Sequence, residues 1–178
     1  MDTLECIRTR RSVRKYTNQP LTNDKIFQII QAAVDAPSGK NGQPWKFRII
    51  TDPSVIEAVS KNSIYYSWLR TSPCFVVVFL DKSCSYNQLK DIQSCGAAMQ
   101  NMMLVAHALG IGSCWIGEIL SKENEVKKML AIDNTDLQLM GIVSFGYTCD
   151  EVMNVGRKKI EEFIRKEVLL RLILARAL

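Results

Sequence analysis

Residues 73–81 read PCFVVVFLD, an almost unbroken run of β-branched and aromatic side chains. A run of this length and composition predicts a strand that is buried on both of its faces. Such a strand needs one apolar layer above the sheet and another below it. Several other segments have helical spacing and can supply those layers. The sequence therefore predicts an α+β domain in which helices cover both faces of a sheet.

The segments around that run alternate between helical and strand patterns. The predicted strands cover residues 45–52, 113–118 and 137–147. The predicted helices start after Asp2 or Thr3, run from Thr22 to Pro37, from Pro53 to about Lys61, from about Asn87 to Leu109, and from Ser121 to Leu130. In the first helix we expect Leu4, Ile7 and Cys6 to face inward. The helix at 87–109 is apolar almost all round, which is typical of a core helix or of a subunit interface.

Composition narrows the class of protein. The 178 residues suit one domain, and 47% hydrophobic with 23% charged residues argues against disorder. The longest apolar runs are too short to span a bilayer, and the arginines near the start argue against a signal peptide. Six cysteines without C-x-x-C spacing indicate reduced thiols in a cytoplasmic protein. His107 is the only histidine, which makes a zinc site improbable, and we expect an ordinary, partly buried helix residue there.

Much of the excess positive charge lies in one short string, RTRRSVRK, from Arg8 to Lys15. The net charge is +5, and the rest of the chain is close to balanced. Guanidinium groups beside a folded core must be solvated or paired, and three or four of them with the hydroxyl of Ser12 would suit a phosphate monoester. A solvated basic turn or a nucleic-acid patch explains the string equally well on its own.

Three further strings could form parts of a binding site. APSGKNGQPW, from Ala36 to Trp45, offers backbone and amide groups that can hydrogen-bond a planar heterocycle, or is an ordinary turn. CWIGE, from Cys114 to Glu118, could lie against a ligand or be a short buried strand. GRKK, from Gly156 to Lys159, could return to an anion or be the charged start of a helix.

Taken together, these strings resemble the nitroreductase family of FMN-dependent enzymes. The resemblance runs from about Leu4 to Lys159 and comprises four features in the family's order: R-R-S-x-R, S-x-x-N-x-Q-P-W, GAAMQNMMLVAHALGIGSCWIG and VSFGY. It implies reduction of nitroaromatics, quinones or related acceptors with NAD(P)H by a ping-pong hydride transfer. The implied site holds FMN and no metal, and no side chain acts as a catalytic acid, base or nucleophile.

The resemblance also assigns roles to residues. Arg10, Ser12 and Arg11 would hold the phosphate and ribityl chain, and Arg14 would tune the flavin from its pyrimidine edge. Gly117 would tune it through a backbone contact near N5, between Ile116 and Glu118. The remaining implied cofactor contacts are Pro37, Ser38, Asn41, Gln43, Arg157 and Lys158. Lys61 and Asn62 are the nearby candidates for further ring contacts, since the segment 61–72 is short.

For the whole molecule, the resemblance implies a three-layer fold with a mixed, mainly antiparallel sheet between helices. It implies a homodimer with FMN at the subunit interface, where residues 10–14 of one chain meet the 37–43 loop of the other. Residues 1–159 would form the FMN-binding domain. Residues 160–178 would form a tail that wraps onto the partner or lies as an amphipathic surface helix. No partnership with nucleic acid or membrane is expected.

Two other functions remain open at this point. One is a flavin-binding or flavin-transfer protein without reductase turnover. The other is a small nucleic-acid-binding domain that uses Arg8 to Lys15. The sequence contains neither a G-x-G-x-x-G fingerprint after a strand nor a P-loop. We therefore expect NAD(P)H to stack transiently on the flavin.

Overall fold

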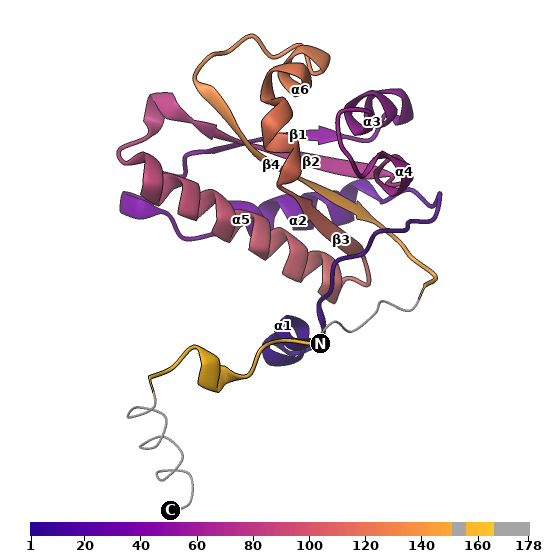
Figure 1. The fold of residues 1–178 in the computed structure, drawn as a ribbon, viewed down its shortest axis with the longest axis vertical. Helices are drawn as coiled ribbons and strands as arrows, with labels where there is room; N and C mark the ends of the chain where they lie inside the picture. Colours follow the sequence, from indigo (N-terminus) through magenta and orange to yellow (C-terminus); the bar gives the residue numbers. More distant parts are fainter. Residues whose placement is uncertain (151–155, 166–178) are drawn as a thin grey trace, which may run out of the picture.

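A computed structural model describes residues 1–150 and 156–165. Its centre is a four-stranded sheet of β1 (Trp45–Ile50), β2 (Cys74–Asp81), β4 (Leu137–Gly146) and β3 (Gly112–Ile116), in that spatial order (Figure 1). All three strand pairs are antiparallel. The expected mainly antiparallel sheet is confirmed. The only parallel pairing within the described residues is an isolated bridge between Ser12 and Ser113.

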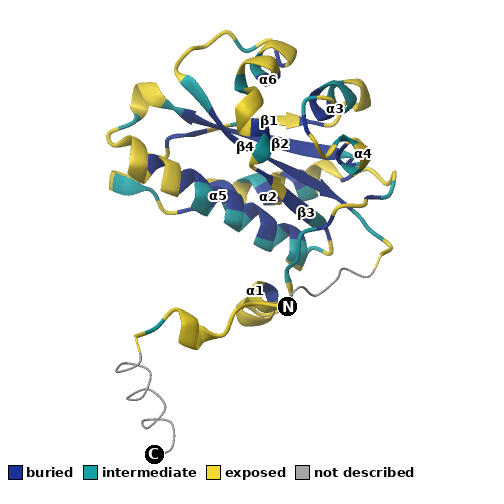
Figure 2. Cartoon of the chain, in the orientation of Figure 1, coloured by how far each residue is buried: buried dark blue, intermediate teal, exposed yellow. Residues whose placement is uncertain are grey.

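The strand β2 is buried on both faces, as its composition predicts. Val76, Val78 and Leu80 belong to one apolar core, and Phe75 and Val77 belong to the other. Alternate side chains of a strand point to opposite faces of the sheet, so a run with no polar position needs cover on both sides. Figure 2 shows the buried strands lying between exposed outer helix surfaces.

Two helices cover one face, and shorter helices cover the other (Figure 1). The first layer is formed by α2 (Asn23–Val34) and α5 (Gln88–Ala108), whose residues share a core with β2 and β4. The second layer contains α3 (Pro53–Ser60), α4 (Tyr66–Leu69) and α6 (Glu123–Met129). The expected α+β layering is therefore present.

Helix α1 (Thr3–Thr9) lies outside the two layers, against the end of α5. Asp2 caps it by accepting a hydrogen bond from the Glu5 N–H at 3.0 Å. Cys6 is buried, with its thiol donating to the Leu104 carbonyl at 3.2 Å. The expectation that Leu4 and Ile7 face inward is wrong, because they are 61% and 51% exposed. A seven-residue helix at the edge of the domain buries only one narrow stripe.

Smaller differences from the predicted elements lie at boundaries. The strand expected to reach Glu118 ends at Ile116, and a 3₁₀ segment, η3 (Glu118–Lys122), precedes α6. The short helix α4 was not predicted. Two further 3₁₀ turns, η1 (Gly39–Asn41) and η2 (Lys82–Cys84), follow α2 and β2, and η4 (Ile160–Glu162) lies in the 156–165 segment. Residues 166–178 of the expected tail lie outside the described residues.

Candidate cofactor site

The arginine segment is fixed to the start of β3. The Val13 N–H donates to the Ser113 carbonyl at 3.0 Å, beside the bridge between Ser12 and Ser113. This close parallel approach requires a glycine at 112, because a Cβ there would lie 2.7 Å from a Val13 methyl group. Segment 10–14 is therefore held at the open edge of the sheet, where β3 has no further strand among the described residues.

Arg10, Ser12 and Arg14 surround the buried thiol of Cys114. Burial raises the pKa of Cys114, while Arg14, a hydrogen bond from Ser12 and Arg10 act in the opposite direction. In an extended segment, residues i, i+2 and i+4 share one side. The alternating pattern R-x-S-x-R thus brings Arg10 and Ser12 to one side of the chain, and Arg14 acts on the same thiol.

Arg10 is a half-buried cation among other cations. Burial lowers the pKa of Arg10, and the neighbouring Arg157 and Arg11 guanidinium groups lower it further. Neither Arg10 nor Arg14 forms an ion pair with a carboxylate of the described chain, whereas the nearby Lys15 pairs with Asp150 at 3.0 Å. A partly buried cation without a counter-ion is unfavourable. An anionic ligand would relieve this repulsion.

A hollow of about 480 Å³ opens beside these arginines, between α1, the end of α5 and the start of β3. The Ser113 hydroxyl at its wall is buried and has no hydrogen-bond partner among the described residues. Buried hydroxyl groups in folded proteins normally have a partner. The orphaned hydroxyl and the arginines therefore fit a ligand that brings hydrogen-bond acceptors. The other lining residues include Arg8, Thr9, His107, Gly110, Gly112 and Thr148.

His107 belongs to this hollow, which sequence reasoning missed. Its Nε2 lies 2.8 Å from the Thr9 hydroxyl. Burial lowers the pKa of His107, and the charges of Arg10 and Arg11 lower it further. The helical pattern around His107 is that of an ordinary α5 residue. Only the docking of α1 brings the imidazole next to the arginines, and no local signal predicts that docking.

The two basic residues predicted from GRKK to contact the phosphate, Arg157 and Lys158, are placed differently by the structure. Arg157 comes close enough to Arg10 to lower its pKa, although 147 positions separate the two in sequence. Lys158 forms an exposed ion pair with Glu162, with Nζ and Oε2 3.6 Å apart. The structure thus brings Arg157 to the cluster and engages Lys158 with its own segment.

The loop at 37–43 adopts an unusual backbone. Lys40, Asn41 and Gln43 all have positive φ angles, between 47° and 55°. The Ser38 hydroxyl accepts a hydrogen bond from the Gln43 N–H at 3.0 Å, which closes the loop. Non-glycine residues in this region are uncommon and are often found at functional sites. Its side chains are mostly exposed, and Pro37 and Ser38 border a shallow hollow with Tyr86 and Lys90.

Within one chain, the loop and the arginines do not meet. The loop lies at the start of α5, where Lys40 stacks over the Tyr86 ring at 4.9 Å, whereas α1 and the arginines lie at the other end of the helix. The helix has 21 residues and is therefore about 30 Å long. No ligand the size of a mononucleotide spans that distance.

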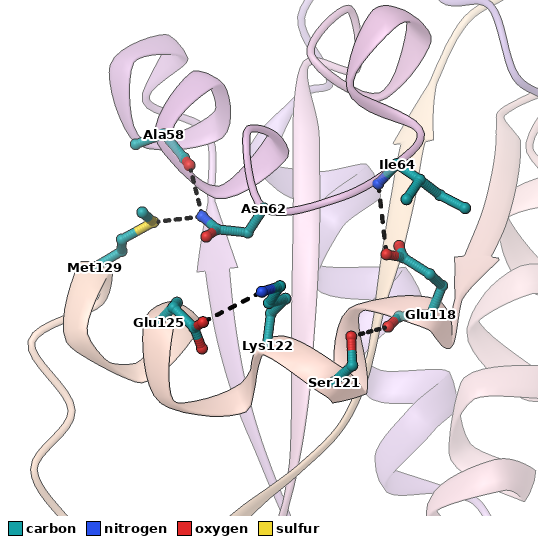
Figure 3. A network of polar contacts seen from close by, with 8 residues as sticks. All are labelled: Ala58, Asn62, Ile64, Glu118, Ser121, Lys122, Glu125 and Met129. Atoms are coloured by element: carbon teal, nitrogen blue, oxygen red, sulfur yellow. Dashed lines mark hydrogen bonds and ion pairs between the residues drawn. The ribbon is translucent and has the colours of Figure 1, made fainter.

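The end of β3 carries the remaining candidates. Ile116 is buried, and Gly117 begins the turn into η3. The Glu118 carboxylate bonds to the loop between α3 and α4. Its Oε2 accepts from the Ser63 hydroxyl at 2.8 Å. Its Oε1 accepts from the Ile64 N–H at 3.4 Å, and its backbone carbonyl accepts from the Ser121 hydroxyl at 3.1 Å (Figure 3). Of the Glu118 groups, the backbone N–H is thus the one left to serve a ligand.

Lys61 and Asn62 are both engaged with their own helix. Lys61 pairs with Glu57 at 3.6 Å. The Asn62 amide donates to the Ala58 carbonyl and to the Met129 sulfur, each at 3.1 Å (Figure 3). Neither side chain therefore extends toward Gly117 from this arrangement.

The site has the shape of a strip along β3. Gly117 lies four positions after Ser113, which corresponds to about 13 Å of strand. One end of the strip is strongly cationic, and the other is the backbone turn at Gly117. This arrangement suits an elongated ligand with an anionic group at one end.

The described residues contain no group of three or more histidine, cysteine or carboxylate side chains placed to hold a metal. None of the helices described is both long and apolar enough to cross a bilayer. Four cysteines are buried, namely Cys6, Cys74, Cys95 and Cys114. Cys84 and Cys149 are exposed.

Comparison with known proteins gives a consistent result. A model described as the Nitroreductase family matches residues 7–65 and 55–147. A candidate NADH dehydrogenase/NAD(P)H nitroreductase of Archaeoglobus fulgidus is 34% identical over 152 residues, which cover 83% of this chain and 86% of that protein. An FMN reductase [NAD(P)H] of Bacillus subtilis is 23% identical over 167 residues, with coverages of 84% and 67%. The crystal structure of a candidate nitroreductase with FMN from Desulfovibrio desulfuricans is 33% identical, has a TM-score of 0.87 and covers 92% of this chain and 96% of that one.

Proposed function

The chain belongs to the nitroreductase family, and on that premise we propose that it reduces nitroaromatic, quinone or related acceptors in a ping-pong cycle. It is an oxidoreductase with FMN as cofactor and NAD(P)H as electron donor. The observation that carries the proposal is the half-buried Arg10 beside the hollow, whose pKa is lowered by burial and by the neighbouring Arg157 and Arg11, and which has no carboxylate partner in the described chain. Repelling cations of this kind need an anion.

The phosphate end of FMN would be held by Arg10, Arg11, Ser12 and Arg157, with Lys158 assisting. The buried Ser113 hydroxyl is an additional donor for this end. Hydrogen bonds between guanidinium groups and phosphate are charge-assisted, and several of them on one phosphate account for tight retention. The residues present therefore fit a mononucleotide at its charged end.

The ring end would lie along β3 toward Ile116, Gly117 and Glu118. When bound, FMN supplies the hydride-transfer chemistry. Arg14 would stabilise negative charge at the pyrimidine edge of the bound flavin, and the Gly117 backbone N–H would serve its hydride-accepting end. In this proposal no side chain acts as a catalytic acid or base. Binding, orientation and a fixed positive charge are the contributions of the chain.

The sequence supports a ping-pong order. The sequence carries no dinucleotide fingerprint. NAD(P)H and the acceptor would therefore take turns at one position beside the ring. Both must be flat enough to enter it.

We place the complete site between two copies of the chain. Pro37, Ser38, Asn41 and Gln43 lie at the opposite end of α5 from the arginines of the same chain, about 30 Å away. A partner in the opposite orientation can bring its own loop to those arginines. The exposed apolar residues on and near α5, namely Leu89, Ile92, Trp115 and Leu120, suit such an interface. The division into a domain at 1–159 and a tail at 160–178 on the partner, and the cytoplasmic location, stay predictions.

Purified protein should carry FMN and should consume NADH or NADPH when 1,4-naphthoquinone or a nitroaromatic is added. Arg10→Ala should weaken FMN binding by about 10- to 100-fold, because it removes charge-assisted hydrogen bonds to phosphate. Titration of the FMN-free protein with FMN measures this affinity. Lys128→Ala is the matched control, since this exposed cation lies on α6, outside both the arginine segment and the 37–43 loop.

Two results would contradict the proposal in different ways. Unchanged FMN affinity in the Arg10→Ala protein would place the phosphate elsewhere. A protein that holds FMN but oxidises neither nicotinamide under anaerobic conditions would be a flavin carrier instead of a reductase.

A further inference from the structure

The loop of residues 61–65 (the strap below) joins α3 to α4 and is bound to the end of β3 by one carboxylate. Both carboxylate oxygens of Glu118 are used. One accepts from the Ser63 hydroxyl at 2.8 Å, and the other accepts from the Ile64 N–H at 3.4 Å (Figure 3). These contacts join residues more than 50 positions apart in sequence. They therefore bring two separate elements together rather than closing a local turn.

On its other side, the strap is held by short-range bonds to α3. The Ser63 N–H donates to the Ser60 carbonyl at 3.0 Å, and the Asn62 amide donates to Ala58 at 3.1 Å. The Ser63 hydroxyl also accepts from the Tyr65 N–H at 3.1 Å, so it donates to Glu118 and accepts from its own loop. Ser63 is only 6% exposed. A buried hydroxyl with both capacities used has one defined position.

The strap presents an apolar side chain outward even though its backbone is fixed. Ile64 is 77% exposed, and the adjacent Tyr65 packs against Trp68 with ring centroids 5.7 Å apart. A single exposed isoleucine is common on protein surfaces. This one differs because its own N–H is bonded to Glu118, the residue that follows Gly117. Only the length of the Glu118 side chain separates Ile64 from the end of β3.

We infer that Glu118 is a positioning residue whose carboxylate clasps the strap and so holds Ile64 as an apolar wall at the acceptor position. The inference rests on the proposed function, because it takes Gly117 as the ring-binding end of the site. A fixed apolar wall favours flat, uncharged ring compounds, such as quinones, over hydrophilic ions. The clasp thereby selects the class of acceptor without touching the reacting atoms.

The wall predicts different effects on two acceptors. In the FMN-loaded enzyme, Ser63→Ala removes the shorter clasp bond, and Ile64→Ala removes the wall but keeps the clasp. Each should raise the KM for 1,4-naphthoquinone about fivefold. For Ser63→Ala this is within the range expected for one hydrogen bond to a charged group, and for Ile64→Ala it is within the range expected for the loss of buried apolar contact. Reduction of ferricyanide, a charged and non-planar acceptor, should change less than about twofold in both variants. A general loss of structure would affect both acceptors alike.

A double-mutant cycle tests whether Glu118 acts through the strap. Glu118→Ala and Ser63→Ala together should raise the naphthoquinone KM no more than Glu118→Ala alone, because both remove one interaction. Glu118→Gln should restore most of the wild-type value, since an amide can accept from Ile64 and donate to Ser63. Glu125→Ala is the control: this nearby carboxylate bonds Lys122 at 3.5 Å and lies away from the strap (Figure 3).

Hydrogen exchange supplies a readout that needs no turnover. In Glu118→Ala the Ile64 amide loses its acceptor, and in Ser63→Ala the Tyr65 amide loses its acceptor, so each should exchange faster than in wild type, with or without FMN. The other amide should also exchange faster in each variant, because the strap is no longer held to Glu118. Unchanged exchange, or additive effects in the cycle, would overturn the clasp even in a protein that binds FMN and oxidises NAD(P)H. Failure to bind FMN would instead refute the proposed function and leave the exchange result interpretable.

Discussion

At the scale of single residues, His107 shows how tertiary contacts change a side chain that looks ordinary in sequence. The string VAHALG is consistent with a partly buried helix residue. In the structure, the imidazole borders the hollow with Arg10 and Arg11, and burial and these charges lower its pKa. A neutral histidine beside arginines avoids adding to their repulsion.

The lowered pKa of His107 predicts a pH dependence of stability. The unfolded chain binds this proton near pH 6.5, while the folded chain binds it only at lower pH. As pH falls through that window, the unfolded state carries more protons and the free energy of unfolding decreases. In His107→Gln that contribution is absent, so the dependence of unfolding on pH should be shallower below about pH 6.5.

Urea denaturation of the FMN-free proteins at several pH values measures this difference. Thr9→Val is a useful control, because it removes the hydroxyl beside Nε2 but leaves the titrating group in place. Identical pH dependence in wild type and His107→Gln would show that the imidazole titrates normally.

Residue-level prediction is strongest where the pattern is local. The spacing of Arg10 and Ser12 predicts that they lie on one side of the chain, and in the structure both act on the buried thiol of Cys114. Prediction could not show that the Glu118 carboxylate is bonded to Ser63 and Ile64, since nothing near Glu118 in sequence indicates a partner 54 or 55 residues away. The contacts to FMN itself stay predictions.

At the scale of elements, β2 and α5 were predictable because their signals are long and unambiguous. The boundaries of α5 agree within one residue with the helix expected from Asn87 to Leu109. The orientation of α1 was not predictable. Its apolar Leu4 and Ile7 have helical spacing, yet only Cys6 packs against α5. A helix of two turns has too few positions for periodicity to identify its buried side.

The junction between the arginine segment and β3 depends on the missing side chain at Gly112. A Cβ at this position would meet three Val13 side-chain atoms at 2.7 to 2.9 Å. Gly112→Ala should therefore push residues 10–14 away from β3, weaken FMN binding and destabilise the fold by about 1–3 kcal/mol. Thermal unfolding and FMN titration measure the two effects.

Gly96→Ala provides the comparison within the same protein. A Cβ at Gly96 meets Trp115 at 3.7 Å, which is ordinary contact, and alanine is favoured over glycine inside a helix. This variant should be as stable as wild type or more so. Wild-type FMN affinity in Gly112→Ala would mean that the bridge does not position the arginines.

At the scale of the whole molecule, the proposed composite site makes a sharp prediction for mixed dimers. Arg10→Ala damages the arginine half of a site, and Asn41→Ala damages the loop half. In a dimer with one chain of each kind, both defects fall on one site and the other site is intact. The mixture should therefore recover FMN binding at up to half of the sites in mixed dimers.

The measurement is FMN content after the two variants are unfolded together, refolded and separated by tags. Arg10→Ala mixed with itself serves as the control and should recover none. A site built from one chain would give no recovery in either mixture. The three-layer architecture was predictable from β2 and its flanking helices, whereas the pairing of chains leaves no periodic trace in a sequence.

The 21 residues of α5 have one more consequence in the proposed dimer. Since neither copy alone surrounds the flavin, subunit separation and coenzyme loss become a single linked equilibrium. Dilution would then release FMN from the protein, and added FMN would shift monomers back to dimers. The yellow absorbance of the bound flavin would thus depend on the concentration of the protein as well as on the concentration of FMN.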